Sequence, residues 1–174
     1  MTTIWYEILP IMLDSDHVVV LRRCEDGEVS SWLAPHQPGI CPNETVLEHL
    51  AGFFGEIFEP QKSIVHSTSW RYDHEVERLI LTYLVVLPKQ LQASLCTATR
   101  RISMQHVKAI EKVYGDNLRP PTRIEVDNVL AHALDHLALL SHYDKSIQSL
   151  LQSEWLDVLQ TRLPKPAGYC PSIL

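Results

Sequence analysis

The sequence predicts an α/β (α+β) fold that is followed by a C-terminal helical hairpin. Two observations support this prediction. Strand-sized apolar runs flank one amphipathic helical segment in the first part of the chain, and two leucine-rich helical segments follow the proline-stiffened "RPPT" at 119–122. We therefore expect a domain over residues 1–118 and a helical extension over residues 119–174 that packs on it.

The first strands are predicted to form hairpins. Residues 4–13 and 17–23 are rich in β-branched and large apolar residues, and the turn-forming "DSD" separates them. The Asp-Gly pair of "CEDGE" then turns the chain into a short strand over residues 29–33. Three prolines and one glycine between residues 34 and 43 predict an irregular loop.

Helical periodicity begins after this loop. At about 100° per residue, the apolar residues of the segment share one broad face, and glutamates and glycines share the other. The apolar face holds Val46, Leu47, Leu50, Phe53, Phe54, Ile57 and Phe58. Proline cannot continue a helix, so Pro60 is expected to end the segment.

Two further strands are predicted at 63–70 and 78–87, joined by the charged tip "YDHEVE". The second is nearly all apolar and should be a central strand that is buried on both faces. The stretch 89–102 fits either a loop or an edge strand, and Ser103 is expected to cap a short helix over 104–114.

The region 124–160 is predicted to hold two amphipathic helices, the second of which follows "SHYD". Their leucine stripes must bury against the first domain, against each other or against a partner. A second copy of the chain or another protein is therefore a candidate partner for this region.

Composition excludes several function classes. The 174 residues are 45% hydrophobic and 21% charged, which is typical of a soluble globular protein. The net charge of −6 argues against a general nucleic-acid or anionic-membrane surface, and the basic pairs are Arg22-Arg23 and Arg100-Arg101. No apolar run approaches the ~20 residues that span a bilayer.

The cysteines and the N-terminus favour a cytoplasmic protein. The four cysteines are dispersed without a CxxC pair, so we expect reduced thiols and neither a disulfide framework nor a cysteine zinc site. The start "MTTIWYEILPIML" lacks the basic residues of a signal peptide.

Three short motifs, together with the order of the elements, resemble the Nudix hydrolase superfamily. "VVVLRR" resembles the strand before the family motif, "SWLAP" resembles its Trp-x-x-Pro, and "PGICPNET" resembles its Gly-rich loop ending in Glu-Thr. The likeness covers roughly residues 4–90 and implies an α/β/α sandwich with a mixed sheet. In that family, carboxylates of the motif helix bind Mg²⁺ or Mn²⁺ and help to activate water for hydrolysis of nucleoside diphosphate derivatives.

The family motif is degenerate in this chain. It runs Gly, five residues, Glu, seven residues, then Arg-Glu-hydrophobic-x-Glu-Glu-x-Gly. When the motif is anchored on "NET", only Glu44 and Glu56 keep its charged residues, and the other charged positions hold Gly52, Phe53 and Ile57. We expect Phe53 and Ile57 to join the buried apolar face of the helix.

The resemblance nominates site residues for either outcome. If catalysis remains, Glu44 and Glu56 are the catalytic candidates, and Mg²⁺ or Mn²⁺ would be the cofactor; otherwise no cofactor is expected. The candidate metal ligands are Glu56, Glu59, Asp73 and Glu75. The candidate pocket residues are His36, Gln37, Glu48, Gly52, Gly55, Glu59, Arg71 and Tyr72. For the helix glutamates and the 73–77 tip, solvated charges without a ligand are the simpler interpretation.

A histidine pair marks the first C-terminal helix. His132 and His136 are four residues apart and share a helix face with Asp135 nearby, a spacing that can hold a metal ion. No third ligand follows in sequence, so polar residues on an ordinary surface helix are the favoured interpretation.

Three function hypotheses follow. The favoured one is a Nudix-like binding, regulatory or assembly module that has lost metal-dependent hydrolysis and still accepts a nucleotide-like small molecule. The first alternative is a divergent Mg²⁺-dependent hydrolase of nucleoside diphosphate derivatives, a Nudix-type pyrophosphohydrolase. The second alternative is a structural subunit without a small-molecule site.

Overall fold

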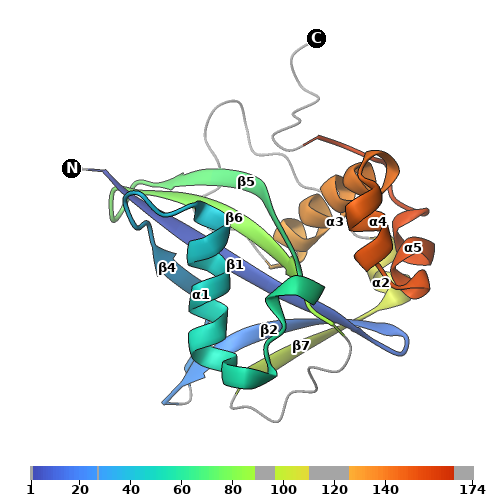
Figure 1. The fold of residues 1–174 in the computed structure, drawn as a ribbon, viewed down its shortest axis with the longest axis horizontal. Helices are drawn as coiled ribbons and strands as arrows, with labels where there is room; N and C mark the ends of the chain where they lie inside the picture. The colour runs from blue at the N-terminus through green and yellow to red at the C-terminus, as the bar shows by residue number, and fades with distance from the viewer. Residues whose placement is uncertain (1, 27, 89–96, 110–125, 167–174) are drawn as a thin grey trace.

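The computed structural model describes residues 2–26, 28–88, 97–109 and 126–166 (Figure 1). The strands are β1 (Thr3–Asp14), β2 (His17–Glu25), β3 (Glu28–Ser30), β4 (Trp32–Pro35), β5 (Ile64–Asp73), β6 (Arg78–Val86) and β7 (Thr97–Ser103). The helices are α1 (Pro42–Phe54), α2 (Met104–Ala109), α3 (Val126–Tyr143), α4 (Lys145–Leu150) and α5 (Ser153–Leu159), with 3₁₀ turns η1 (Gly55–Ile57) and η2 (Pro60–Lys62).

The seven described strands form one mixed sheet. Five of them follow in the order β3-β2-β1-β6-β5, while β4 pairs with β1 and β7 pairs with β2 beside this path. One edge of β1 pairs in parallel with β6 from Thr3 to Ile11. The other edge pairs antiparallel with β4 near the start of β1 and with β2 near its end, and β2 in turn pairs with β7. The predicted hairpins are confirmed, and β6 is the predicted central strand.

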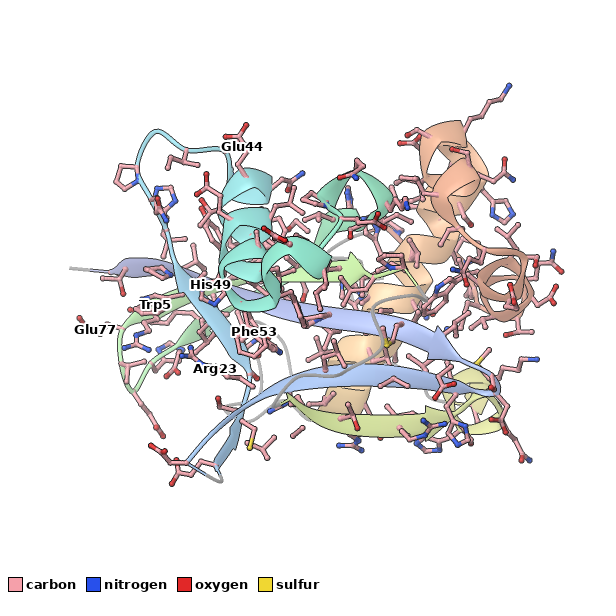
Figure 2. All side chains as sticks on the ribbon, turned by 60° about the horizontal axis from the view of Figure 1, so that its bottom comes forward. Trp5, Arg23, Glu44, His49, Phe53 and Glu77 are labelled. Atoms are coloured by element: carbon pink, nitrogen blue, oxygen red, sulfur yellow. The ribbon has the colours of Figure 1, made fainter. Side chains whose placement is uncertain are left out.

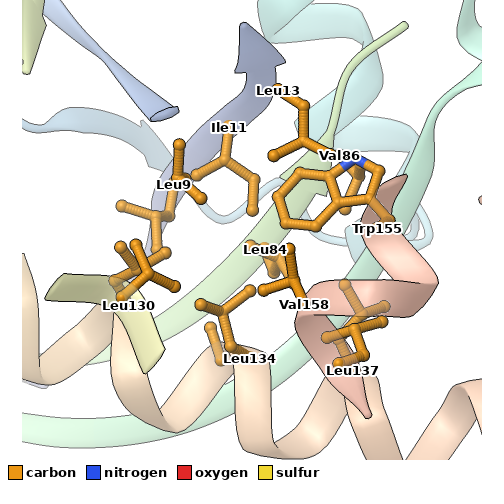
Figure 3. Packing of buried hydrophobic residues seen from close by; sticks show 14 of the residues in the cluster. Leu9, Ile11, Leu13, Leu84, Val86, Leu130, Leu134, Leu137, Trp155 and Val158 are labelled. Carbon is orange, nitrogen blue, oxygen red and sulfur yellow. The ribbon is translucent and has the colours of Figure 1, made fainter. Parts of the chain in front are cut away.

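Both faces of this sheet are apolar because successive strand residues point in opposite directions. On β1, Leu9, Ile11 and Leu13 pack into one buried cluster, and Ile8 and Met12 pack into another. The first cluster is covered by α3 and α5, and the second by α1. Figure 3 shows the first cluster, where Leu84 of β6 meets the leucines of α3. The predicted α/β/α layering is confirmed.

The helix α1 differs from its prediction at both ends. It begins at Pro42, where proline supplies the backbone angle of a first helical turn, and it ends at Phe54, well before Pro60. Gly55 ends it, because this residue has φ 63°, a left-handed angle that glycine adopts readily. Glu56 and Glu59 therefore do not continue the polar face of α1. Ile57 is 48% exposed, so its predicted burial on the helix is wrong.

The segment before α1 is also more regular than predicted. Residues 28–35 form two short strands, β3 and β4, where a single strand over 29–33 was expected. β4 continues to Pro35 because it pairs with β1. This pairing joins segments that are distant in sequence, so local composition could not predict it. The irregular loop is thereby shortened to residues 36–41.

The helices after β7 pack on the sheet. Ser103 Oγ accepts a hydrogen bond from the His106 amide at 3.2 Å, which confirms the predicted cap of α2. α3 is confirmed, but the second predicted helix is two short helices that break at Leu151. Leu151 has an extended backbone and is buried, and the break lets both α4 and α5 contact α3. The predicted linker at 119–122 lies outside the described residues.

A buried arginine ties the C-terminal segment to these helices. Arg162 Nε donates to Asp135 Oδ1 of α3 at 2.8 Å, and its terminal nitrogens donate to the carbonyls of Val107 in α2 and Ala131 in α3. A guanidinium suits this role because its planar fork carries five donors. None of the described helices is long and apolar enough to cross a lipid bilayer.

Two glycines at the end of α1 give a matched stability test. A Cβ at either Gly52 or Gly55 would meet nothing within 4 Å, but only Gly55 has a left-handed φ. We expect Gly52→Ala to stabilise the fold by about 0.5–1 kcal/mol, because glycine inside a helix costs backbone entropy. Gly55→Ala should destabilise it by about 1–3 kcal/mol. Urea unfolding measures both, and equal effects of the two substitutions would contradict this account of the helix end.

Candidate functional site

The degenerate motif lies on α1 and on the strands that α1 packs against. Val46, Leu50 and Phe54 form the buried spine of α1. His49 and Phe53 each precede a residue of this spine by one position and are four residues apart. They therefore form a second row along the helix, next to the buried one. Figure 2 shows His49 and Phe53 on α1, with Arg23 of β2 beneath them.

Phe53 is held by an aromatic contact. Its ring meets Trp32 of β4 edge-on, with centroids 4.4 Å apart and an interplanar angle of 85°. Trp32 is fixed in turn, because it is buried and its Nε1 donates to the Leu21 carbonyl at 3.0 Å. Edge-to-face pairs of this kind add about 0.5–1.5 kcal/mol beyond the burial of area. The position that holds a metal-binding glutamate in the Nudix motif therefore serves the packing of α1.

The residues of this region do not fit a Mg²⁺ or Mn²⁺ ion. These cations need several oxygen ligands that converge on one point. Glu44 and Glu56 are both exposed, but Glu44 lies in the first turn of α1 and Glu56 in the 3₁₀ turn η1 after its end. Glu59 is paired with Lys62 at 2.9 Å. Across the described ranges, no three His, Cys, Asp or Glu side chains gather closely enough to hold a metal ion.

Glu48, Gly52 and Gly55 line an open surface of α1. Glu48 is exposed, and the space that a Cβ would take at either glycine is empty to 4 Å. The two glycines therefore leave the backbone of α1 exposed on this side.

Arg71 forms an ion pair with Glu7, which is not a residue of the motif. Its Nη2 donates to Glu7 Oε1 at 2.9 Å, its Nη1 donates to the other carboxylate oxygen, and Thr82 Oγ1 donates to that oxygen at 3.1 Å. Burial raises the pKa of Glu7, but the hydrogen bonds and charge of Arg71 outweigh this effect and hold the pKa below its usual value. This guanidinium joins β5 to β1, so a ligand phosphate would have to compete with a bidentate ion pair.

The tip between β5 and β6 is an ordinary turn. Asp73 Oδ1 accepts a hydrogen bond from the Glu75 amide at 3.1 Å, and Glu75 is exposed. Tyr72 is partly buried and meets His74 edge-on at 4.8 Å. These predicted site residues stabilise the tip itself.

His36 is anchored to the sheet beneath the motif loop. Its Nδ1 is 2.5 Å from the buried Tyr6 hydroxyl, and its amide donates to the Ile4 carbonyl at 3.0 Å. Burial, with a smaller contribution from Cys41, raises the pKa of Tyr6. Gln37 is exposed, and its carbonyl accepts the Ile40 amide across a turn at Gly39. The contact with Tyr6 was not predicted, because it joins residues thirty positions apart.

Arg23, which the sequence singles out only as part of a basic pair, and His49, which it does not single out, lie on β2 and α1 near the motif-like stretch. Val19 and Leu21 of β2 pack into the cluster under α1, and strand alternation places Arg23 on the same face. Arg22 instead connects β2 to β3, since its Nε donates a hydrogen bond to the Ser30 carbonyl at 3.2 Å. Burial and then the positive charge of Arg23 lower the pKa of His49. The alternation of side chains along β2 could have predicted that Arg23 faces α1. The position of His49 relative to Arg23 depends on the tertiary fold and could not be predicted from local sequence.

Comparison with solved structures agrees with this architecture. Shewanella oneidensis NrtR is similar at a TM-score of 0.58 and 14% identity, over 95% of this chain and 80% of that one. A MutT/nudix family protein from Enterococcus faecalis is similar at a TM-score of 0.50 and 9% identity, over 87% of this chain and 68% of that one. An ADP compounds hydrolase reaches 0.40 at 16% identity, over 80% of this chain and 75% of that one, which is too low to add to the assignment.

These similarities define the class of protein: the chain has a Nudix-like fold. At such low identities they establish the architecture and leave the activity to the residues of the site. No protein-family model and no curated protein matches the chain in sequence.

The histidines of α3 lie in the interior, which corrects the favoured interpretation of a surface helix. His132 and His136 are only 3% and 6% exposed, because α3 is sandwiched between the sheet and the C-terminal segment. His132 Nε2 donates to the Thr68 carbonyl at 2.8 Å. The His136 ring stacks on His66 of β5 with centroids 4.8 Å apart, and its Nδ1 donates to the Lys165 carbonyl at 3.3 Å.

These histidines should make stability depend on pH. Burial lowers the pKa of both His66 and His136. The neighbouring His136 lowers the pKa of His66 further while Asp144 opposes this, and the hydrogen bond to the Lys165 carbonyl opposes the effect of burial at His136. A histidine with a lowered pKa stays neutral in the fold while the unfolded chain takes up a proton. Stability is therefore full above about pH 6.5 and falls as pH drops from there through the lower folded pKa values.

We expect urea unfolding between pH 8 and pH 5 to show this loss, with a slope of up to about 1.4 kcal/mol per pH unit for each such histidine. His66→Gln should flatten the slope. His74→Gln, at an exposed position, is the matched control. A slope that is unchanged in His66→Gln would contradict the attribution of the pH dependence to these buried histidines.

Proposed function

We propose that this chain is a Nudix-fold binding module that does not hydrolyse its ligand by a metal-dependent route, and that the ligand is a nucleotide-like small molecule. The observation that carries the proposal is the contact of Phe53 with Trp32, at 4.4 Å between ring centroids. Phe53 is partly buried, so a carboxylate at position 53 would lie against an indole ring and lose part of its hydration without gaining a partner there.

The surroundings of α1 support binding without metal chemistry. Gly52 leaves the backbone of α1 exposed, and His36 lies in the loop that leads into the helix. Small-molecule sites are typically concave and carry a few fixed polar groups. Two cavities of about 270 and 300 Å³ in the described part of the chain lie elsewhere, beside Trp155 and beside His142, and contain none of the predicted site residues.

A partner surface is a second part of the proposal, in line with a regulatory or assembly role. The leucine stripe of α3 is covered by the sheet, so it does not face solvent. Tyr143 and Leu150, which are 82% and 43% exposed, are the large apolar side chains that this region presents. A homodimer or a protein partner would contact these residues.

The hydrolase alternative is tested by turnover. The chain would be incubated with Mg²⁺ or Mn²⁺ and a panel of nucleoside diphosphate derivatives, as wild type, Glu56→Gln and, as a matched control, Glu28→Gln at an exposed position of β3. We expect no turnover above the protein-free rate in any of the three. Turnover that is present in wild type and Glu28→Gln but lost in Glu56→Gln would overturn the proposal.

Ligand binding is tested separately in the same panel with EDTA present. A ligand that binds only the folded state raises the melting temperature, by an amount that depends on its concentration relative to Kd. A rise with at least one nucleotide supports the binding module. No rise with any compound would instead favour a structural subunit.

A further inference from the structure

We propose that a cavity between the end of β6 and the helices α4 and α5 binds a small uncharged organic molecule that carries one hydrogen-bond acceptor. The indole N–H of Trp155 is the donor that this acceptor meets. None of the described residues that line the cavity belongs to α1. The inference therefore goes beyond the proposed nucleotide-binding function and does not rest on it.

The cavity is built by segments that are distant in sequence. Its volume is about 270 Å³, and the start of β5, the end of β6 and the α4–α5 turn border it. Its buried apolar wall is formed by Ile64, Val86, Leu87 and Trp155. Leu150 lies at the rim, with 43% of its surface exposed. An apolar cavity of about 150 Å³ in another protein takes up benzene, so this cavity has room for one or two rings.

Trp155 brings an unused donor to this wall. Its side chain is only 2% exposed, and Figure 3 shows the indole nitrogen on the side of Val86, which also lines the cavity. The backbone amide of Trp155 donates to the Gln152 carbonyl at 3.0 Å, but the indole N–H has no acceptor within the part of the chain that the structure describes. An indole nitrogen can only donate, and a buried one usually has a partner.

The other buried indole, that of Trp32, shows what is missing at Trp155. Both side chains are buried in apolar clusters, and Trp32 Nε1 donates to the Leu21 carbonyl at 3.0 Å. A buried donor without an acceptor costs free energy, because it has lost its hydrogen bond to water. An oxygen atom in the cavity removes this cost, and the apolar wall favours a ligand whose remaining atoms are hydrocarbon.

The charges beside the cavity favour an uncharged ligand. Lys62 is the charged side chain in the lining, and its Nζ lies 2.9 Å from the Glu59 carboxylate. The lysine is therefore already neutralised, whereas a carboxylate or phosphate in the cavity would lose its hydration next to an apolar wall. A ketone oxygen accepts the indole hydrogen bond without that cost.

The test uses the neutral ketones acetophenone, indanone and tetralone as probes of the full chain. The matched hydrocarbons ethylbenzene, indane and tetralin carry the same rings without the acceptor, and benzoate supplies a charged acceptor. We expect at least one ketone to shift the Trp155 indole resonance downfield in proton–nitrogen NMR spectra, because a new hydrogen bond deshields the N–H proton. The hydrocarbons and benzoate should not move this resonance downfield.

Affinities from the backbone amides in the same titrations should change in a matched pattern. Trp155→Phe removes the donor and keeps a ring, so it should weaken ketone binding relative to that of the matched hydrocarbon by about fivefold. Leu150→Ala shortens the rim of the apolar wall and should weaken both classes of probe by about two- to fivefold. Leu163→Ala is the matched control for Leu150→Ala, because Leu163 is 68% exposed and lies outside the lining.

The wild-type spectra decide the proposal even if Trp155→Phe fails to fold. Failure of every ketone to shift the Trp155 resonance, up to the solubility limit of each probe, would overturn the site. Equal affinity for ketones and hydrocarbons, or tighter binding of benzoate, would overturn the assigned ligand chemistry. None of these outcomes bears on nucleotide binding or turnover, so failure of this site and failure of the proposed function are distinguishable.

Discussion

The parallel pairing of β1 with β6 is the constraint on which the rest of the structure depends. The pairing runs from Thr3 opposite Arg78 to Ile11 opposite Val86, and the apolar residues of both strands alternate between the two faces. Since water must be excluded from both faces, a helical layer is needed on each. The helix α1 supplies one layer, and α3 with α5 supplies the other.

This constraint explains why a helix is needed at the position of the motif whether or not it carries the motif's chemistry. The apolar spine of α1 is required to cover one face of the sheet, whatever the adjacent row carries. In this chain that row holds His49 and Phe53, and the contact of Phe53 with Trp32 extends the packing into the place that a metal ligand occupies in the Nudix motif. The scaffold is thus separable from the reaction, as is general for widely used folds.

Much of the fold could be predicted from local periodicity, and less of the site. Alternating and helical patterns located β1, β2, β5, β6, α1 and α3, because each has an apolar face that a short window of sequence reveals. The end of α1 was missed because a left-handed φ at Gly55 decided it. The buried role of His136 depends on Lys165 and His66, and the role of Arg71 depends on Glu7, so both required contacts between distant segments.

The central claim is that the end of α1 no longer holds a divalent cation. Paramagnetic broadening by substoichiometric Mn²⁺ in amide NMR spectra tests it directly, because the broadening marks the residues nearest a bound ion. The account predicts that the amides of residues 50–58 broaden no more than those beside exposed acidic residues elsewhere, such as Glu28 and Glu75. Selective broadening centred on Glu56 would contradict it.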